Sequence, residues 1–189
     1  MVSLKEYGVF RDNMSILKEL SKDDHGDGNV QYMTDSLIGA VDFDIVKRKY
    51  ANKLGLTEEV ATSVDALLQV SNGVVFVEFK NGKMKNTSIT NKIKDSLLIF
   101  CDIIGETIKS TRDTIDFVLV YNEEKNWRAR QDVQKGKSKE EKHRSMIGKH
   151  YMKKANKELI LFGLEKYKTL YFREVHTYTE SEFENFLLR

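Results

Sequence analysis

The sequence predicts an α/β fold built around a partly parallel sheet. Two strand-like segments, 62–70 and 74–80, flank Asn72-Gly73, an arrangement typical of a β-hairpin. A helical pattern over 87–104 separates this hairpin from 115–122, an almost continuously apolar segment of the kind buried on both faces of a sheet. A helix between two strands of one sheet predicts a crossover connection, and therefore parallel pairing of those strands.

The N-terminal part of the chain is predicted to be mainly helical. Apolar residues recur every three or four positions over 4–20, which predicts an amphipathic helix. The polar, glycine-bearing stretch 21–29 predicts a loop. Residues 31–55 predict one or two helices, the second beginning at one of the aspartates in 42–44 and ending just before Gly55.

The C-terminal part is predicted to contain a basic helical region, a strand and a helix. Residues 138–161 have a mostly helical pattern, and 170–179 alternate like a strand. Residues 181–188 predict a short helix capped by Thr179 or Ser181.

Length and composition exclude several classes of protein. A chain of 189 residues with 40% hydrophobic residues can bury a core without disulfides or a structural metal. Its single cysteine, Cys101, excludes a disulfide framework and a CxxC zinc site. No apolar run approaches the ~20 residues of a membrane span. The charged N-terminus is unlike a signal peptide. We therefore expect a cytoplasmic protein with no membrane partner.

Positive charge is concentrated in one part of the single domain expected over 1–189. That domain is expected to have a core at about 40–122, a basic helical region at 123–168, and a terminal strand and helix at 169–189. The whole chain has a net charge of +2, but residues 122–168 alone carry +7. Such a block is typical of nucleic-acid-binding surfaces. A solvated, lysine-rich helix would account for the same charge.

The most informative local pattern is Asp65 followed by Glu78-Phe79-Lys80. With an Asn72-Gly73 turn, Asp65 pairs with Lys80 and lies diagonal to Glu78, so all three side chains project from one face. A divalent cation with oxygen ligands would relieve the repulsion between two carboxylates so close together. A bound Mg²⁺ activates water and polarises a phosphoryl oxygen, and a nearby lysine can stabilise the developing charge. These groups suit phosphodiester hydrolysis, although an acid–lysine pair on a solvated hairpin face would look the same.

This pattern and its setting resemble the PD-(D/E)XK nuclease superfamily, which includes restriction endonucleases, junction resolvases and repair nucleases. The resemblance covers about 40–122, where the expected order of elements follows the superfamily core of helix, three-strand meander, helix and strand. It implies a restriction-endonuclease-like mixed β-sheet flanked by helices, with the basic helical region inserted before the last strand. It also implies Asp65 and Glu78 as metal ligands for Mg²⁺ or Mn²⁺, the Phe79 carbonyl as a further ligand, and Lys80 as the catalytic lysine.

The sequence departs from the superfamily pattern in two places. Val64 precedes Asp65 where the pattern has proline, and no first meander strand is evident between Leu54 and Thr62.

Auxiliary site residues are expected on the two helices of this core. Many superfamily members add an acid from the first helix, for which Asp42 and Asp44 are the candidates, although either could instead cap that helix. Asn91 and Lys92 lie in the first turn of the helix after the motif. Either could support the site or belong to a solvated face.

The basic region would contact a nucleic-acid backbone without reading its sequence. The expected contact residues are Arg128, Arg130, Lys135, Lys137, Lys142, Arg144, Lys149, Lys153 and Lys154. Trp127 could stack on a base or close the edge of the core.

The leading hypothesis is therefore a metal-dependent endonuclease that hydrolyses DNA, or RNA as the less favoured substrate, in phage defence, restriction or repair. Many superfamily members dimerise, so a homodimer is compatible with this hypothesis. The alternatives are a non-catalytic nucleic-acid-binding module on a nuclease-derived fold, and a protein-interaction module whose basic helix binds an acidic surface.

Overall fold

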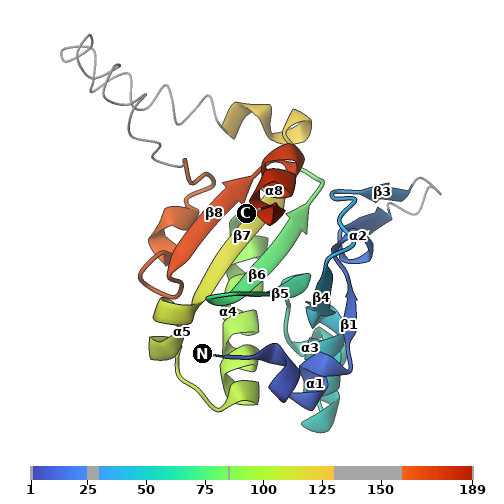
Figure 1. The fold of residues 1–189 in the computed structure, drawn as a ribbon, viewed down its shortest axis with the longest axis vertical. Coiled ribbons are helices and arrows are strands. Elements are labelled where there is room, and N and C mark those ends of the chain that lie inside the picture. Colours follow the sequence, from blue (N-terminus) through green and yellow to red (C-terminus); the bar gives the residue numbers. More distant parts are fainter. Residues whose placement is uncertain (1, 25–29, 85, 130–158, 189) are drawn as a thin grey trace.

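The fold is organised around one mixed β-sheet. The computed structural model describes residues 2–24, 30–84, 86–129 and 159–188. In this part of the chain, six strands form a sheet in the order β1-β4-β5-β6-β7-β8 (Figure 1). They are β1 (Met14–Ile16), β4 (Gly39–Asp42), β5 (Ala66–Val70), β6 (Gly73–Lys80), β7 (Ile115–Tyr121) and β8 (Glu174–Tyr178). Neighbours from β1 to β6 are antiparallel, whereas β6, β7 and β8 run parallel. The predicted α/β class with a partly parallel sheet is confirmed.

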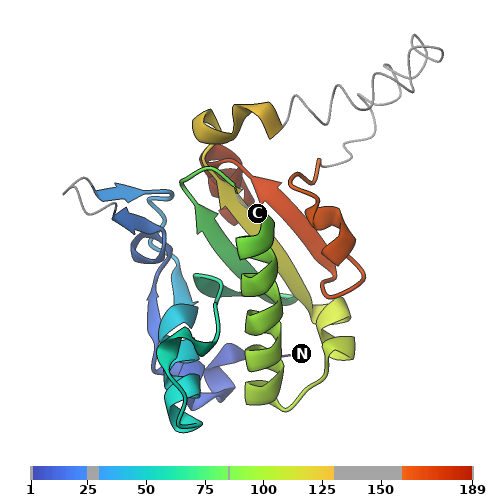
Figure 2. The same cartoon turned by 180° about the vertical axis from the view of Figure 1, so that it is seen from behind.

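One long helix and one shorter helix cover opposite faces of the sheet. Figure 2 shows α4 (Asn86–Ile104) lying along one face, where Phe76 belongs to the buried cluster. On the other face, Val77 packs in a second buried cluster with Phe183 of α8 (Glu180–Leu187). Because both faces are covered, β6 and β7 read as continuous apolar runs rather than as alternating strands.

The remaining described elements are short. They are α1 (Gly8–Arg11), α2 (Leu17–Leu20), α3 (Phe43–Lys53), α5 (Ile108–Thr114), the 3-10 helices η1 (Leu4–Glu6), η2 (Glu58–Val60), η3 (Glu124–Asn126) and η4 (Leu164–Tyr167), and the separate antiparallel pair β2 (Lys22–Asp24) and β3 (Val30–Tyr32).

The predicted crossover helix is confirmed. The helix expected over 87–104 is α4, and Ile89, Ile93 and Phe100 on its predicted apolar face are buried. Gly105 follows it at φ +72°, a left-handed conformation that suits glycine at the end of a helix. The chain then returns through α5 to β7, which pairs parallel to β6.

The predicted turn of the hairpin is wrong by one residue. Gly73 pairs with Val70 inside the sheet, so the turn falls at Ser71 and Asn72. A Cβ at Gly73 would lie 2.0 Å from the carbonyl oxygen of Thr114, so this glycine allows a close approach of two backbones rather than a turn.

The register of the hairpin therefore also differs from the prediction. Ala66 pairs with Val77, and one further step would set Asp65 opposite Glu78 rather than opposite Lys80. A shift of two residues leaves every side chain on its original face, because side chains alternate with a period of two.

The predicted N-terminal helix over 4–20 is wrong. That stretch forms η1, α1, β1 and α2 in succession. Its buried residues Phe10 and Leu17 are seven apart, as on one face of a helix, but Met14–Ile16 pairs with β4 at the edge of the sheet. A three-residue strand held by a partner more than twenty residues away leaves little trace in local periodicity.

The predictions for residues 21–55 are partly confirmed. The second helix expected there is α3, whose N-cap is Asp42, and Gly55 follows its end at φ +70°. The stretch before it contains β3 and β4 instead of a first helix, and β2 lies within the predicted loop.

The predicted C-terminal strand and helix are present. The strand is shorter than expected, as β8 begins at Glu174. Thr179 caps α8 in a reciprocal capping box with Glu182. Most of the basic helical region predicted at 138–161 lies outside the described residues.

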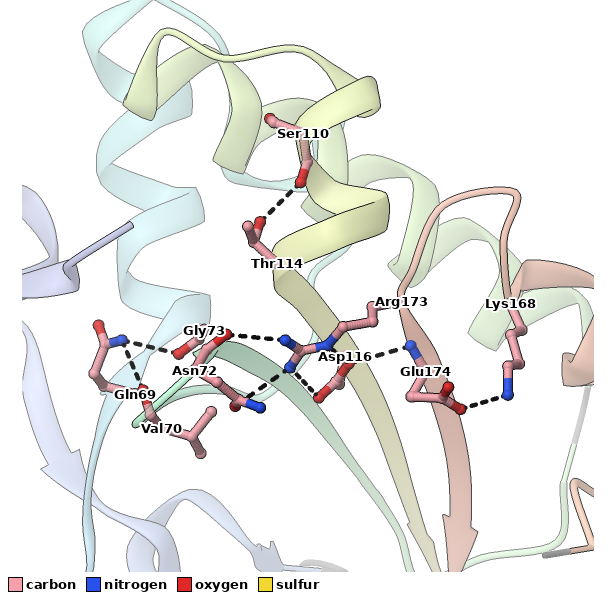
Figure 3. Close-up of polar contacts among 10 residues, drawn as sticks. All are labelled: Gln69, Val70, Asn72, Gly73, Ser110, Thr114, Asp116, Lys168, Arg173 and Glu174. Carbon is pink, nitrogen blue, oxygen red and sulfur yellow. Dashed lines mark hydrogen bonds and ion pairs between the residues drawn. The ribbon is translucent and has the colours of Figure 1, made fainter. Parts of the chain in front are cut away.

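A polar cluster joins three strands at the end of the sheet that carries the hairpin turn (Figure 3). The Arg173 guanidinium donates to both carboxylate oxygens of Asp116, at 2.9 and 2.7 Å, and to the carbonyl oxygen of Asn72 at 2.9 Å. The backbone N–H of Glu174 donates to the same Asp116 carboxylate. Arg173 thus ties β7 and β8 to the β5–β6 turn.

Among the described helices, none is long and apolar enough to cross a membrane.

Candidate functional site

A cavity of about 390 Å³ lies beside the C-terminal end of β6. One wall comes from the end of α2 and from β2, and another from the start of α3. Asp65 and Lys80 line it between these walls. It therefore lies at the end of the sheet opposite the Arg173 cluster.

Asp65 is fixed at the cavity by backbone hydrogen bonds on both sides. Its N–H donates to the carbonyl of Val77 at 3.1 Å, and its carbonyl accepts from the N–H of Phe43 at 3.2 Å. Its carboxylate oxygen Oδ2 accepts from the backbone N–H of Phe79 at 2.6 Å. One carboxylate oxygen is thus held against β6, which leaves Oδ1 for a second contact.

That second contact comes from helix α4. The Lys92 ammonium lies 3.2 Å from Asp65 Oδ1 and 2.7 and 2.9 Å from the two carboxylate oxygens of Glu78. One turn further along α4, the Ser96 hydroxyl accepts from the N–H of Val64 at 2.8 Å. This hydrogen bond holds α4 against the residue that precedes Asp65.

The three charged groups differ in their contact with solvent. The Glu78 side chain is 2% exposed, whereas those of Asp65 and Lys92 are 18% and 25% exposed. Glu78 lies between apolar neighbours on β6, so without Lys92 its charge would be buried with no compensating cation nearby. A buried carboxylate is tolerated only where it is paired.

Burial raises the pKa values of both acids, and repulsion from Asp65 adds to the rise at Glu78. Burial raises the pKa of Asp65, although the charge of Lys92 and the Phe79 N–H oppose the rise. Burial and the charge of Asp65 raise the pKa of Glu78 well above its usual range. Burial lowers the pKa of Lys92, but the two carboxylates outweigh it and the net shift is upward. Lys92 is therefore an ammonium at neutral pH.

The motif lysine occupies a different place from the one predicted. Lys80 lines the cavity at the end of β6, but it is not opposite Asp65 and forms no ion pair with any residue that the structure describes. Lys92, which the sequence offered only as an auxiliary residue, contacts both acids instead. The signal for Lys92 was its position near the start of the helix that follows the motif.

The other auxiliary candidates have separate roles. Asp42 accepts from the backbone N–H of Ile45 at 2.9 Å and so caps α3. Asp44 also lines the cavity and accepts a hydrogen bond from the hydroxyl of Ser63. Asn91 is exposed on α4 and contributes no described contact to the site.

Sequence reasoning missed the wall formed by α2 and β2. This wall places Lys22 at the cavity, while Arg48 of α3 lines it from the other side. The neighbouring strand β3 is joined to the end of β6 by a 2.8 Å hydrogen bond from Asn81 to the Gln31 side chain. No local pattern marked this wall, because its strands have three residues each.

Most of the predicted nucleic-acid contacts lie outside the described residues. These are Arg130, Lys135, Lys137, Lys142, Arg144, Lys149, Lys153 and Lys154. Arg128 is described, and its guanidinium lies over the ring of Trp127 at 5.1 Å from the ring centre. The Trp127 side chain is 52% exposed, so it does not close the edge of the core.

The donor set at Asp65 and Glu78 suits a hard divalent cation. Mg²⁺ is commonly bound by one or two carboxylates and completes its shell with water and substrate oxygens. The Phe79 carbonyl points to the same side of β6 as its N–H, which contacts Asp65. No described group of three or more acidic, histidine or cysteine side chains could hold a metal. A cation here would therefore rest on two carboxylates, with most of its shell supplied by solvent or substrate.

Comparison with known proteins found no matching family model, no matching curated protein and no matching solved structure. The function is therefore argued from the geometry of the site.

Proposed function

We propose that this protein is a metal-dependent nuclease that hydrolyses phosphodiester bonds, with Asp65, Glu78 and Lys80 as its central residues. The observation that carries the proposal is the position of the Lys92 ammonium, within 3.2 Å of Asp65 and 2.9 Å of both Glu78 oxygens. A single cation therefore reaches both carboxylates at once, as a bound metal ion would have to do.

The arrangement of the elements supports a restriction-endonuclease-like core. β4, β5 and β6 form an antiparallel meander, and α4 connects β6 to the parallel strand β7. The motif acids lie at the start of β5 and near the end of β6, as the resemblance implies. One feature departs from it, because the first meander strand, β4, precedes helix α3 in the chain instead of following it.

Each residue of the site would have a separate role in phosphodiester hydrolysis. A divalent cation bound there would supply Lewis-acid activation of water and of a phosphoryl oxygen. Asp65, Glu78 and the Phe79 carbonyl would hold that cation. Lys80, at the cavity and without a described ionic partner, would stabilise the negative charge that develops on the phosphate.

The cavity and the basic region would bind the backbone of the nucleic acid. Lys22 and Arg48 lie on opposite walls of the cavity, where they could contact phosphates on either side of the cleaved bond. The net charge of +7 over 122–168 would add sequence-independent affinity, with DNA favoured over RNA as substrate. Such binding must weaken steeply as salt concentration rises, so a flat salt dependence would count against this role.

The experiment that tests the proposal is cleavage of a mixed panel of DNA and RNA with Mg²⁺, with Mn²⁺ and with EDTA. Glu78→Ala and Lys80→Ala are compared with the parent protein and with Lys94→Ala, a control on the exposed side of α4. We expect metal-dependent cleavage that both site variants lose and the control retains. Cleavage that survives in EDTA or in Glu78→Ala would refute the proposal.

A non-catalytic nucleic-acid-binding module is the second candidate. The observation that favours it is that Lys92 already neutralises part of the charge of Asp65 and Glu78, so the cluster is stable without a metal. Salt-sensitive binding of nucleic acid, with no cleavage under any metal condition, would support this candidate over the nuclease.

A further inference from the structure

The Lys92 ammonium lies where a metal ion shared by Asp65 and Glu78 would have to lie. It contacts Asp65 Oδ1 and both carboxylate oxygens of Glu78 at 2.7–3.2 Å. We propose that Lys92 is a built-in cation that competes with divalent metal for this site, so that metal binds only when the Lys92 side chain withdraws. This inference rests on the metal site of the proposed function and adds how access to it is controlled.

Two cations cannot occupy the same bridging position between Asp65 Oδ1 and the Glu78 carboxylate. Mg²⁺ sits about 2.0–2.1 Å from its oxygen ligands. An ion that bridged Asp65 Oδ1 and Glu78 at that distance would overlap the ammonium or lie directly against it. At such separations the repulsion between like charges is large in a poorly solvated site. A metal ion that bridges the two carboxylates and the observed Lys92 contacts therefore exclude each other.

The lysine is the member of the cluster that can move. Its side chain is 25% exposed, whereas Glu78 is 2% exposed and Asp65 is tied to the Phe79 N–H. The backbone of α4 is fixed by Ile93, which is completely buried. Withdrawal therefore requires only rotation of the flexible lysine side chain toward solvent.

Competition predicts that removing the ammonium tightens metal binding. With Lys92 the cluster carries a net charge of −1, and without it −2. Lys92→Met keeps an unbranched side chain of similar length and leaves the two carboxylates for the metal. We expect Lys92→Met to bind Mn²⁺ at least ~10-fold more tightly than the parent protein, since a charge contact of this kind is worth about 1.4 kcal/mol or more.

The test is calorimetric titration of Mn²⁺ into the parent protein, Lys92→Met, Lys80→Met and Lys94→Met. Lys80→Met removes a positive charge at the cavity without touching the carboxylate contacts, and Lys94→Met removes one from the exposed side of α4. We expect the affinity for Mn²⁺ to rise at least ~10-fold in Lys92→Met and less than ~3-fold in Lys80→Met. In Lys94→Met it should be unchanged. An equal, weaker or absent affinity in Lys92→Met, or an equal gain in Lys80→Met, would overturn the inference.

A second measurement uses the unaltered protein and does not depend on the stability of any variant. The Lys92 ¹⁵Nζ resonance is followed by NMR during titration with Mg²⁺, together with the carboxyl ¹³C resonances of Asp65 and Glu78. We expect all three to shift at the same Mg²⁺ concentration, with loss of the protection of the Lys92 ammonium from hydrogen exchange. Carboxyl shifts with an unchanged Lys92 resonance, or no shifts at all, would overturn the inference. Metal competition without cleavage of any nucleic acid would instead leave the inference standing and refute the proposed nuclease function.

Discussion

Replacing Lys92 with methionine should destabilise the metal-free fold, because it leaves Glu78 charged and buried. The Glu78 side chain is 2% exposed and has Lys92 as its described cationic contact. Breaking a buried ion pair by removing one partner costs about 3–5 kcal/mol. Glu78→Gln should cost less, about 1–3 kcal/mol, because Lys92 keeps Asp65 as a partner at 3.2 Å. The double variant Lys92→Met/Glu78→Gln has no unpaired buried charge at position 78. Its loss of unfolding free energy should therefore be smaller than the sum of the losses in the two single variants.

The assay is urea unfolding followed by circular dichroism for the parent, both single variants and the double variant. We expect the double variant to be more stable than the sum of the single losses implies, by about 1–3 kcal/mol of coupling. Lys94→Met should stay within about 0.5 kcal/mol of the parent. A cost below about 1 kcal/mol for Lys92→Met, or strictly additive losses, would show that the buried pair is not the source of stability.

The same variant should depend on pH in a defined direction. The pKa of Glu78 is raised above its ordinary value of 4.5 in the folded protein, and loss of Lys92 removes a charge that opposes this rise. An acid whose folded pKa exceeds its unfolded value destabilises the fold as pH rises from the unfolded pKa through the folded one. The stability deficit of Lys92→Met should therefore be smaller at pH 5 than at pH 8. A deficit that grows on acidification would contradict this sign.

Three further substitutions test the scaffold, each measured by urea unfolding. Gly73→Ala should cost at least about 3 kcal/mol, because its Cβ would lie 2.0 Å from the Thr114 carbonyl oxygen, a backbone atom that cannot turn aside. Thr179→Ala should cost about 0.5–2 kcal/mol by removing the capping box of α8. Arg173→Met should cost about 3 kcal/mol or more, because Asp116 loses two charge-assisted hydrogen bonds at a side chain that is 15% exposed.

Matched controls separate these effects from general disturbance. Gly55→Ala also places alanine at positive φ, but nothing lies within 4 Å of the new Cβ, so it should cost only about 1–2 kcal/mol. Asn185→Ala changes an exposed residue of α8 away from its cap and should stay within about 0.5 kcal/mol. If Gly73→Ala and Gly55→Ala lost equal free energy of unfolding, backbone conformation, and not the close approach of Thr114, would explain why position 73 is glycine.

The parts of the fold that the sequence predicts well are those with a long local signal. Helix α4 places a buried residue at nearly every turn, and most positions of β6 and β7 are apolar because helices cover both faces of the sheet. Helix α3 is marked at both ends, by the Asp42 cap and by Gly55. These features depend on residues close together in the chain.

The parts that it predicts poorly depend on distant partners. Strand β1 has three residues and exists because β4 pairs with it. Gly73 follows Asn72 as in a typical turn, but glycine is needed there because a Cβ would collide with the backbone at Thr114. In the site, a motif supplies the spacing of Asp65 and Glu78, but which lysine reaches them depends on how α4 packs across the sheet, so Lys92 took the contact expected of Lys80.

The hairpin that carries the two acids also has a consequence for the order of folding. Asp65 and Glu78 are brought together by a two-residue turn, so their approach needs only a short loop closure. Lys92 joins them only when α4 docks on the sheet, which is a less local event than the closure of the hairpin. We therefore expect the hairpin to pass through a stage in which like charges face each other without a counterion. Protonation or a dissolved divalent cation should reduce the repulsion between the two carboxylates at that stage. Millimolar Mg²⁺ should therefore speed refolding more than it slows unfolding.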